Sequence, residues 1–324
     1  MKHNIQITFI LLVMFIITQL IGLAVIHVYS PQYVQVLING TLMNISVGPQ
    51  LPYGMQPPEI APEISLTTII ISFAIAILLI FILTRIKAIL FLRLWFFIVV
   101  VIVLGITLNA LLSQFIQYEL VFNQYHFSIP AIISIIIALP LAIFKIFKRN
   151  LIVHNLTELM VYPGIAAVFV PILNIWTIIV LILIISAYDI WAVWHSGFMQ
   201  KMAKFQIDEM KIFAGFFVPY LGRKERLMMQ KMRAKKKKGK MKEKRIKVNL
   251  AILGGGDVVF PIITAGIVFN VLGLIPALIV VACATLALLY LFVFAKKGKF
   301  YPAMPFLTAG LLIGIGISYL IQLI

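Results

Sequence analysis

Two aspartates lie within strongly apolar segments of the chain, where charged side chains are rare. Asp257 follows three consecutive glycines at the start of a run of about twenty apolar residues, and Asp189 lies in the preceding apolar segment. A charged Asp near the centre of a bilayer costs roughly 2.5–3.5 kcal/mol on insertion scales, so an acid inside a membrane span indicates a functional site. Because the two segments are consecutive and would run antiparallel, we expect the carboxylates at similar depths, within roughly one or two helical turns.

Paired carboxylates in an apolar site support one well-defined chemistry. Two such groups cannot both ionise when they lie close together, so one keeps its proton. The ionised Asp then takes a proton from a water that attacks a peptide carbonyl, while the protonated Asp polarises the carbonyl oxygen and a proton is returned to the leaving nitrogen. Asp189 and Asp257 are therefore candidate catalytic residues of an aspartic protease, and either could carry the proton. A helix-packing hydrogen bond is the alternative role of a single membrane Asp.

The glycines before Asp257 suit this use. Gly254, Gly255 and Gly256 remove side chains beside the acid and allow close approach of another helix or of a substrate backbone. Each also weakens a helix by up to about 1 kcal/mol. Local opening of the helix would admit water and an extended peptide. Small-residue helix packing alone would explain the glycines but not the Asp.

The composition places these residues in an integral membrane protein. The chain is 63% hydrophobic and 11% charged, with a mean hydropathy of +1.10, unlike a soluble domain. A membrane span needs about 20 mostly apolar residues. Nine such segments are visible, at roughly 5–28, 65–84, 88–112, 128–147, 152–172, 174–194, 248–268, 271–294 and 303–323. We predict an all-α polytopic membrane protein with nine transmembrane helices, the first being an uncleaved anchor.

The basic residues indicate the orientation. Segments 29–64 and 113–127, which would join spans one to two and three to four, contain no Lys or Arg. The basic clusters all fall on the opposite side, which the positive-inside rule makes the cytoplasm. We therefore expect a cytoplasmic N-terminus and a C-terminus outside. The chain divides into helices one to five (1–172) and helices six to nine (173–324), with a basic cytoplasmic loop at 201–247.

Two loops have unusual compositions. Loop 201–247 holds 17 of the 27 basic residues and only four acids. This favours contact with anionic lipid headgroups, at about 1 kcal/mol per Lys or Arg, over nucleic acid. Within this loop, the apolar run 212–219 is too short to span and predicts a strand or a segment lying on the membrane. The exterior loop 31–64 carries glycosylation-type triplets at Asn39 and Asn44, and its prolines favour an irregular or extended backbone.

In order and placement, the motifs resemble those of the presenilin and signal peptide peptidase family of intramembrane aspartyl proteases. Tyr188-Asp189 is similar to the family's Tyr-Asp on the sixth span, and Gly254-Gly255-Gly256-Asp257 to its Gly-x-Gly-Asp on the seventh. Pro302-Ala303-Met304 is similar to Pro-Ala-Leu at the start of the ninth span, with Met in place of Leu. The resemblance covers mainly 174–310. It implies that the residues around the two acids and the Pro302–Met304 backbone position the substrate.

The resemblance also implies an activity and a substrate class. By its predicted orientation the chain looks like presenilin rather than signal peptide peptidase. The resemblance to the family as a whole implies cleavage of transmembrane helices or signal peptides, without a cofactor. We expect a stand-alone protease of the plasma membrane. A helical peptide bond is shielded, so the substrate must unwind, and in lipid its freed backbone groups need partners. The 212–219 run or the residues before Gly254 could supply these partners by strand addition.

Other function classes stay open from the sequence. A proton- or cation-coupled transporter also uses paired intramembrane acids, although no inverted repeat is visible and no basic partner is expected within the spans. A prepilin-type leader peptidase shares the Gly-x-Gly-Asp motif but has fewer spans and lacks the third motif. The five His residues are scattered and form no His-Glu-x-x-His motif, so no metal site is predicted.

Overall fold

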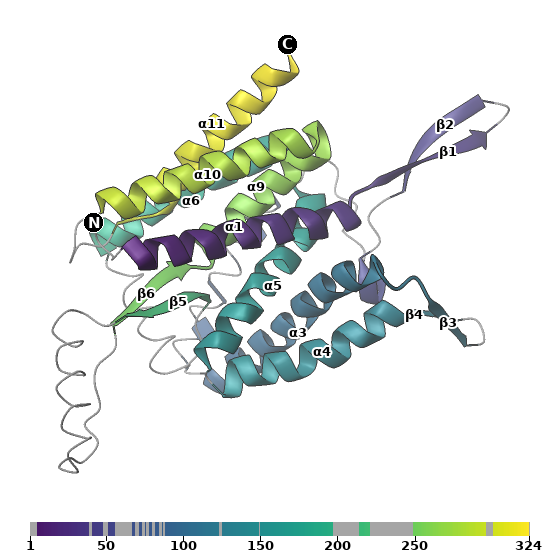
Figure 1. Cartoon of the computed structure of the whole chain (residues 1–324), viewed down its shortest axis with the longest axis horizontal. Coiled ribbons are helices and arrows are strands. Elements are labelled where there is room, and N and C mark those ends of the chain that lie inside the picture. Colours follow the sequence, from purple (N-terminus) through teal and green to yellow (C-terminus); the bar gives the residue numbers. More distant parts are fainter. Residues whose placement is uncertain are drawn as a thin grey trace.

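The fold is mostly helical (Figure 1). The computed structural model describes residues 5–38, 41–47, 51–55, 88–122, 125–148, 150–196, 214–220, 249–295 and 301–323, with scattered residues between 67 and 86. Within these ranges, seven helices are long and apolar enough to cross a membrane. The predicted class of polytopic helical membrane protein is therefore confirmed.

The helix boundaries follow the lengths of the apolar runs. The long helices are α1 (Ile5–Val28), α3 (Ile89–Ser113), α4 (Ile129–Phe147), α5 (Leu151–Phe169), α6 (Ile175–Trp191), α10 (Leu274–Phe294) and α11 (Met304–Gln322). A shorter helix, α9 (Gly256–Leu272), has 17 residues. The described part of the chain thus accounts for eight of the nine predicted segments. Most of the predicted second span, 65–84, and most of the basic loop 201–247 lie outside the described residues.

The prediction of a helix over 248–268, the seventh span, is wrong for its first residues. Residues Asn249–Gly254 form strand β6, and α9 begins only at Gly256. Consecutive glycines disfavour a helix, and the chain before them pairs with β5 (Gly215–Tyr220). Asp257 therefore lies in the first turn of α9, not well inside a helix.

The described part of the chain contains three two-stranded antiparallel sheets. Strand β5 pairs with β6 in the register Gly215↔Gly254 to Tyr220↔Asn249, so of the two alternatives for the run 212–219, a strand or a segment lying on the membrane, the strand is the one observed. At the opposite end of the molecule, β1 (Gln32–Ile38) pairs with β2 (Thr41–Val47), and β3 (Glu119–Phe122) pairs with β4 (Tyr125–Ser128) (Figure 1). The segment predicted as an exterior loop, 31–64, thus begins with two paired strands, and its prolines all follow Val47 apart from Pro31.

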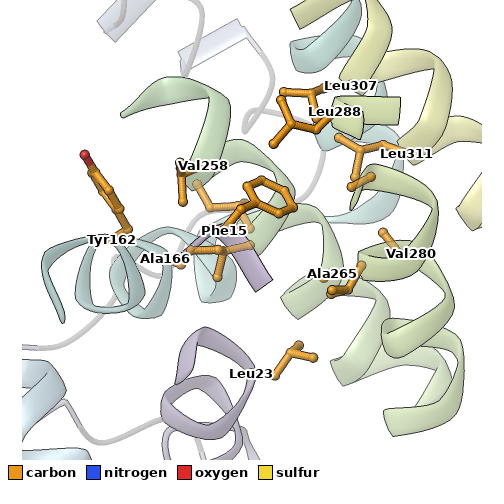
Figure 2. Close-up of a cluster of buried hydrophobic side chains, with 14 of the residues drawn as sticks. Phe15, Leu23, Tyr162, Ala166, Val258, Ala265, Val280, Leu288, Leu307 and Leu311 are labelled. Atoms are coloured by element: carbon orange, nitrogen blue, oxygen red, sulfur yellow. The ribbon is translucent and has the colours of Figure 1, made fainter. Parts of the chain in front are cut away.

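Helix α9 lies in the centre of the bundle, against α1, α5, α10 and α11. Figure 2 shows the core that surrounds it, with Phe15 of α1, Val258 of α9 and Leu307 of α11 among the buried side chains. Small residues allow the closest contacts, because a Cβ added at Gly22 or Gly266 would collide with side chains of the facing helix. Large apolar side chains on the outer helix faces are exposed, as expected for surfaces that contact lipid.

The described part of the chain contains an ion pair inside the bundle, so the expectation of no basic partner within the spans is wrong. Lys145 Nζ in the last turn of α4 lies 2.9 Å from Glu158 Oε1 of α5, and the side chains are 2% and 1% exposed. The sequence places Lys145 in a basic cluster at a membrane surface. Packing of α4 against α5 instead brings this lysine inward.

Candidate active site

Asp189 joins α6 to the start of α11. It lies in the last turn of α6, and the residue is 5% exposed. Its Oδ2 accepts a hydrogen bond of 3.0 Å from the backbone N–H of Met304, and the backbone N–H of Ala303 also bonds to it. The predicted Pro302-Ala303-Met304 motif therefore meets the first acid through two main-chain donors.

Asp257 lies against the backbone of the glycine run. The backbone N–H of Gly254 donates a hydrogen bond to its carboxylate. A Cβ at Gly254 would lie only 3.1 Å from Asp257 Oδ2, so a side chain there would press on the acid. Asp257 also interacts electrostatically with Asp189. The structure thus brings the two predicted acids, from α6 and α9, into one site.

The middle glycine of the run packs beneath an aromatic ring. A Cβ at Gly255 would lie 3.1 Å from both Cε1 and the hydroxyl oxygen of Tyr162, a buried residue of α5. The Tyr162 ring contacts Phe216 of β5 edge-on, with 5.4 Å between centroids. At Gly256 an added Cβ would make only ordinary contact with Phe260. The predicted close approach therefore applies to Gly254 and Gly255.

The other motif residues differ in their surroundings. Tyr188 is 42% exposed and its ring packs against Trp191, 6.2 Å between centroids. Pro302 and Met304 are buried, and Ala303 is partly buried. Tyr188 thus lies at the surface of the helix beside a buried acid, whereas the third motif is enclosed.

Helices α1 and α5 contribute polar residues that the sequence analysis missed. Gln19 of α1 is fully buried, and its Nε2 donates to the carbonyl of Val258, 3.1 Å away. On α5, His154 Nε2 lies 2.8 Å from the carbonyl oxygen of Gly215. The sequence signal that could have identified Gln19 and His154 is a polar side chain within an otherwise apolar run. Each of these two side chains bonds to the backbone near Gly254–Gly256.

Asn155 of α5 occupies the outer edge of strand β5. Its Nδ2 donates to the carbonyl of Phe217 at 2.7 Å, and its Oδ1 accepts from the N–H of the same residue at 2.9 Å. Alternate residues of an antiparallel strand direct their backbone groups to opposite edges. The backbone groups of Gly215 and Phe217 therefore face α5, and β5 has no open edge at this position.

The outer edge of β6 remains available by the same alternation. Ile252 is opposite Phe217 in the register, so its backbone groups face away from β5. Ile252 is 41% exposed. Within the described part of the chain, the sheet consists of β5 and β6 only. The edge runs from Ile252 to Gly254, whose N–H bonds to Asp257.

The fold and the paired acids define the class of an intramembrane aspartyl protease, and the comparisons with known proteins agree. The family model described as signal-peptide peptidase, presenilin aspartyl protease matches residues 53–324. The chain belongs to this family, and its activity is that of a hydrolase cutting peptide bonds within the membrane. The transporter and leader-peptidase alternatives are not favoured.

Two solved structures share the fold. Each is described as a presenilin family intramembrane aspartate protease, one in the C222 and one in the P2 space group. The first is 16% identical, with a TM-score of 0.58, and the match covers 97% of this chain and 99% of that one. The second is 15% identical, with a TM-score of 0.57 and 96% coverage of both chains. No curated protein matches.

Proposed function

We propose that Asp189 and Asp257 are the catalytic pair, and that they hydrolyse peptide bonds within transmembrane helices by activating a water molecule. The observation that carries this proposal is the meeting of the two acids, from separate helices, in one site lined by backbone N–H donors. Such fixed donors stabilise negative charge in a site that excludes bulk water.

The two acids accept different numbers of backbone N–H hydrogen bonds, and we propose different catalytic roles for them on this basis. Asp189 accepts backbone N–H bonds from Ala303 and Met304, whereas Asp257 accepts one from Gly254. Hydrogen bonds from N–H groups favour the charged form of a carboxylate. In our proposal Asp189 is therefore the ionised base that takes a proton from water. Asp257 carries the shared proton and donates a hydrogen bond to the scissile carbonyl.

We further propose that the unwound substrate adds as a strand to β6. Asn155 and His154 already bind the outer edge of β5, so the β6 edge beside Ile252 is the one that can accept another strand. Because this edge leads to Gly254 and Asp257, a paired substrate would enter the catalytic site within a few residues. The motif residues Tyr188, Gly255, Gly256 and Pro302 complete the substrate-positioning set in this proposal.

The finer topology is part of the same proposal. Nine spans, a cytoplasmic N-terminus and an exterior C-terminus are supported by the distribution of Lys and Arg. This places the basic loop 201–247 at anionic headgroups of the plasma membrane. Substrates would enter with their N-termini outside, and segments 1–172 and 173–324 would act as supporting and catalytic parts of a stand-alone protease.

A cleavage assay in liposomes with a single-span model substrate tests the proposal. Asp189→Asn and Asp257→Asn keep the side-chain shape, and each should abolish cuts within the span. Thr285→Val on α10, which loses only a bond to its own helix, serves as the control and should cut normally. Mass analysis of the products locates the cuts. Continued cutting by either Asp variant, at the same bonds and rate, would refute the assignment.

A further inference from the structure

A polar array follows one face of α5, between strand β5 and the glycines before Asp257. His154, Glu158 and Tyr162 are spaced by four residues, so they share a face of the helix. They are 9%, 0% and 1% exposed. Lys145 of α4 pairs with the central member of this array, Glu158. We call these four residues the α5 array.

One end of the array binds strand β5. His154 Nε2 lies 2.8 Å from the carbonyl oxygen of Gly215, which can only accept, so this nitrogen must carry the proton. The same nitrogen lies 3.5 Å from Glu158 Oε1. A carboxylate beside a histidine fixes which ring nitrogen is protonated and how the ring is oriented. Glu158 therefore holds His154 in the form that binds β5.

The other end of the array reaches the glycine run. Tyr162 packs on Gly255 and interacts electrostatically with both Glu158 and Asp257. Its ring also contacts Phe216, next to the residue that His154 binds. The hydroxyl of Tyr162 is buried. Glu158 is thus the centre of a chain of contacts that begins at β5 and ends beside Asp257.

Stability alone does not account for a charged pair in this place. Removing two charges from water costs several kcal/mol per ion, and replacing a buried ion pair by apolar residues of similar volume is often neutral or stabilising. The side chains of Lys145 and Glu158 are 2% and 1% exposed in a protein that spans a membrane. Charged residues in such surroundings mark functional positions.

We propose that the Lys145–Glu158 pair is a positioning device for proteolysis. It orients His154 and Tyr162, and these hold β5 and Gly255 in place relative to Asp257. By fixing the strand pair against the acid, the α5 array determines which substrate bond reaches the catalytic site. The inference rests on the proposed function, since it acts through the strand edge and the aspartate pair.

The test replaces both charges at once. The double variant Lys145→Met/Glu158→Leu leaves no unpaired buried charge, and we expect a melting temperature equal to or above that of the wild type. We expect kcat/KM on a single-span substrate in liposomes to fall about tenfold to hundredfold, because small misplacements of reacting groups have effects of this size. The cuts should also spread to neighbouring bonds in the mass spectrum of the products.

A second pair of variants tests the array through His154. His154→Gln keeps an N–H donor for the Gly215 carbonyl and should retain the wild-type cut sites, whereas His154→Leu should shift them. Thr107→Val is the matched control, because it removes a buried bond to the Met160 carbonyl of α5 away from the array. It should not move the cut sites.

The outcomes separate this inference from the proposed function. Wild-type rate and cut sites in the double variant would overturn the positioning role. If the double variant does not fold, identical cut sites in His154→Gln and His154→Leu would overturn it equally. Failure of the wild type to cut, or continued cutting by Asp189→Asn and Asp257→Asn, would instead refute the proposed catalytic pair.

Discussion

Asn155 should be essential for cleavage although it lies outside every sequence motif. Its side chain satisfies both the N–H and the C=O of Phe217, which is 8% exposed. Asn155→Leu removes both of these hydrogen bonds, and losing the partner of a buried backbone group costs about 1–3 kcal/mol. The change therefore weakens the docking of β5 by about 2–6 kcal/mol. Since about 1.4 kcal/mol corresponds to a factor of ten, we expect at least a tenfold loss of cleavage rate.

A variant at the start of the same helix controls for loss of helix stability. Asn150 Oδ1 caps α5 by accepting from the N–H of Ile152 at 2.9 Å, so Asn150→Ala costs about 1 kcal/mol of helix stability without touching the strand. We expect its rate to stay within about twofold of wild type. Hydrogen exchange of peptide 214–220 should accelerate in Asn155→Leu only. Wild-type cleavage and unchanged exchange in Asn155→Leu would show that β5 is not held by this side chain.

Two further substitutions distinguish side-chain from backbone roles, both measured by the same cleavage assay. Gln19→Leu removes a buried bond to the Val258 carbonyl, worth about 1 kcal/mol, and should slow cleavage several-fold. Thr18→Val, which loses only a bond within its own helix, should have little effect, and equal rates in the two variants would contradict the role of Gln19. Met304→Leu should keep the rate within about twofold, because Met304 contacts the acid through its backbone N–H and the swap conserves volume. A tenfold loss would show that the thioether itself matters.

The helices were predictable because the membrane sets their length. A bilayer requires about 20 apolar residues per span, and the first predicted span, 5–28, coincides with α1 (Ile5–Val28). The same signal failed at 248–268, because a short apolar run does not distinguish a strand from a buried helix. Only the glycines marked the break, and pairing with a strand more than thirty residues earlier decided its conformation.

The acids of the site were predictable, and their supporting residues were not. A carboxylate in an apolar run is conspicuous in a sequence. Gln19, His154 and Asn155 act instead on the carbonyls and amides of other elements, and backbone groups carry no side-chain pattern. Their partners depend on which helices are neighbours. The same holds for Lys145, whose partner Glu158 is set by the packing of α4 on α5.

Each proposed catalytic acid lies beside the start of a helix. Asp257 is in the first turn of α9, and Asp189 receives the N–H of Met304, the first residue of α11. The first N–H groups of a helix have no partner within it, and an unsatisfied N–H in an apolar interior costs several kcal/mol. At the start of α11 the Asp189 carboxylate satisfies such a donor, and at the start of α9 the Asp257 carboxylate is stabilised by the positive end of the helix dipole. The interruptions at Gly254–Gly256 and at Pro302 therefore solve two problems together: they open the backbone beside the acids, and they supply the donors that make buried carboxylates tolerable.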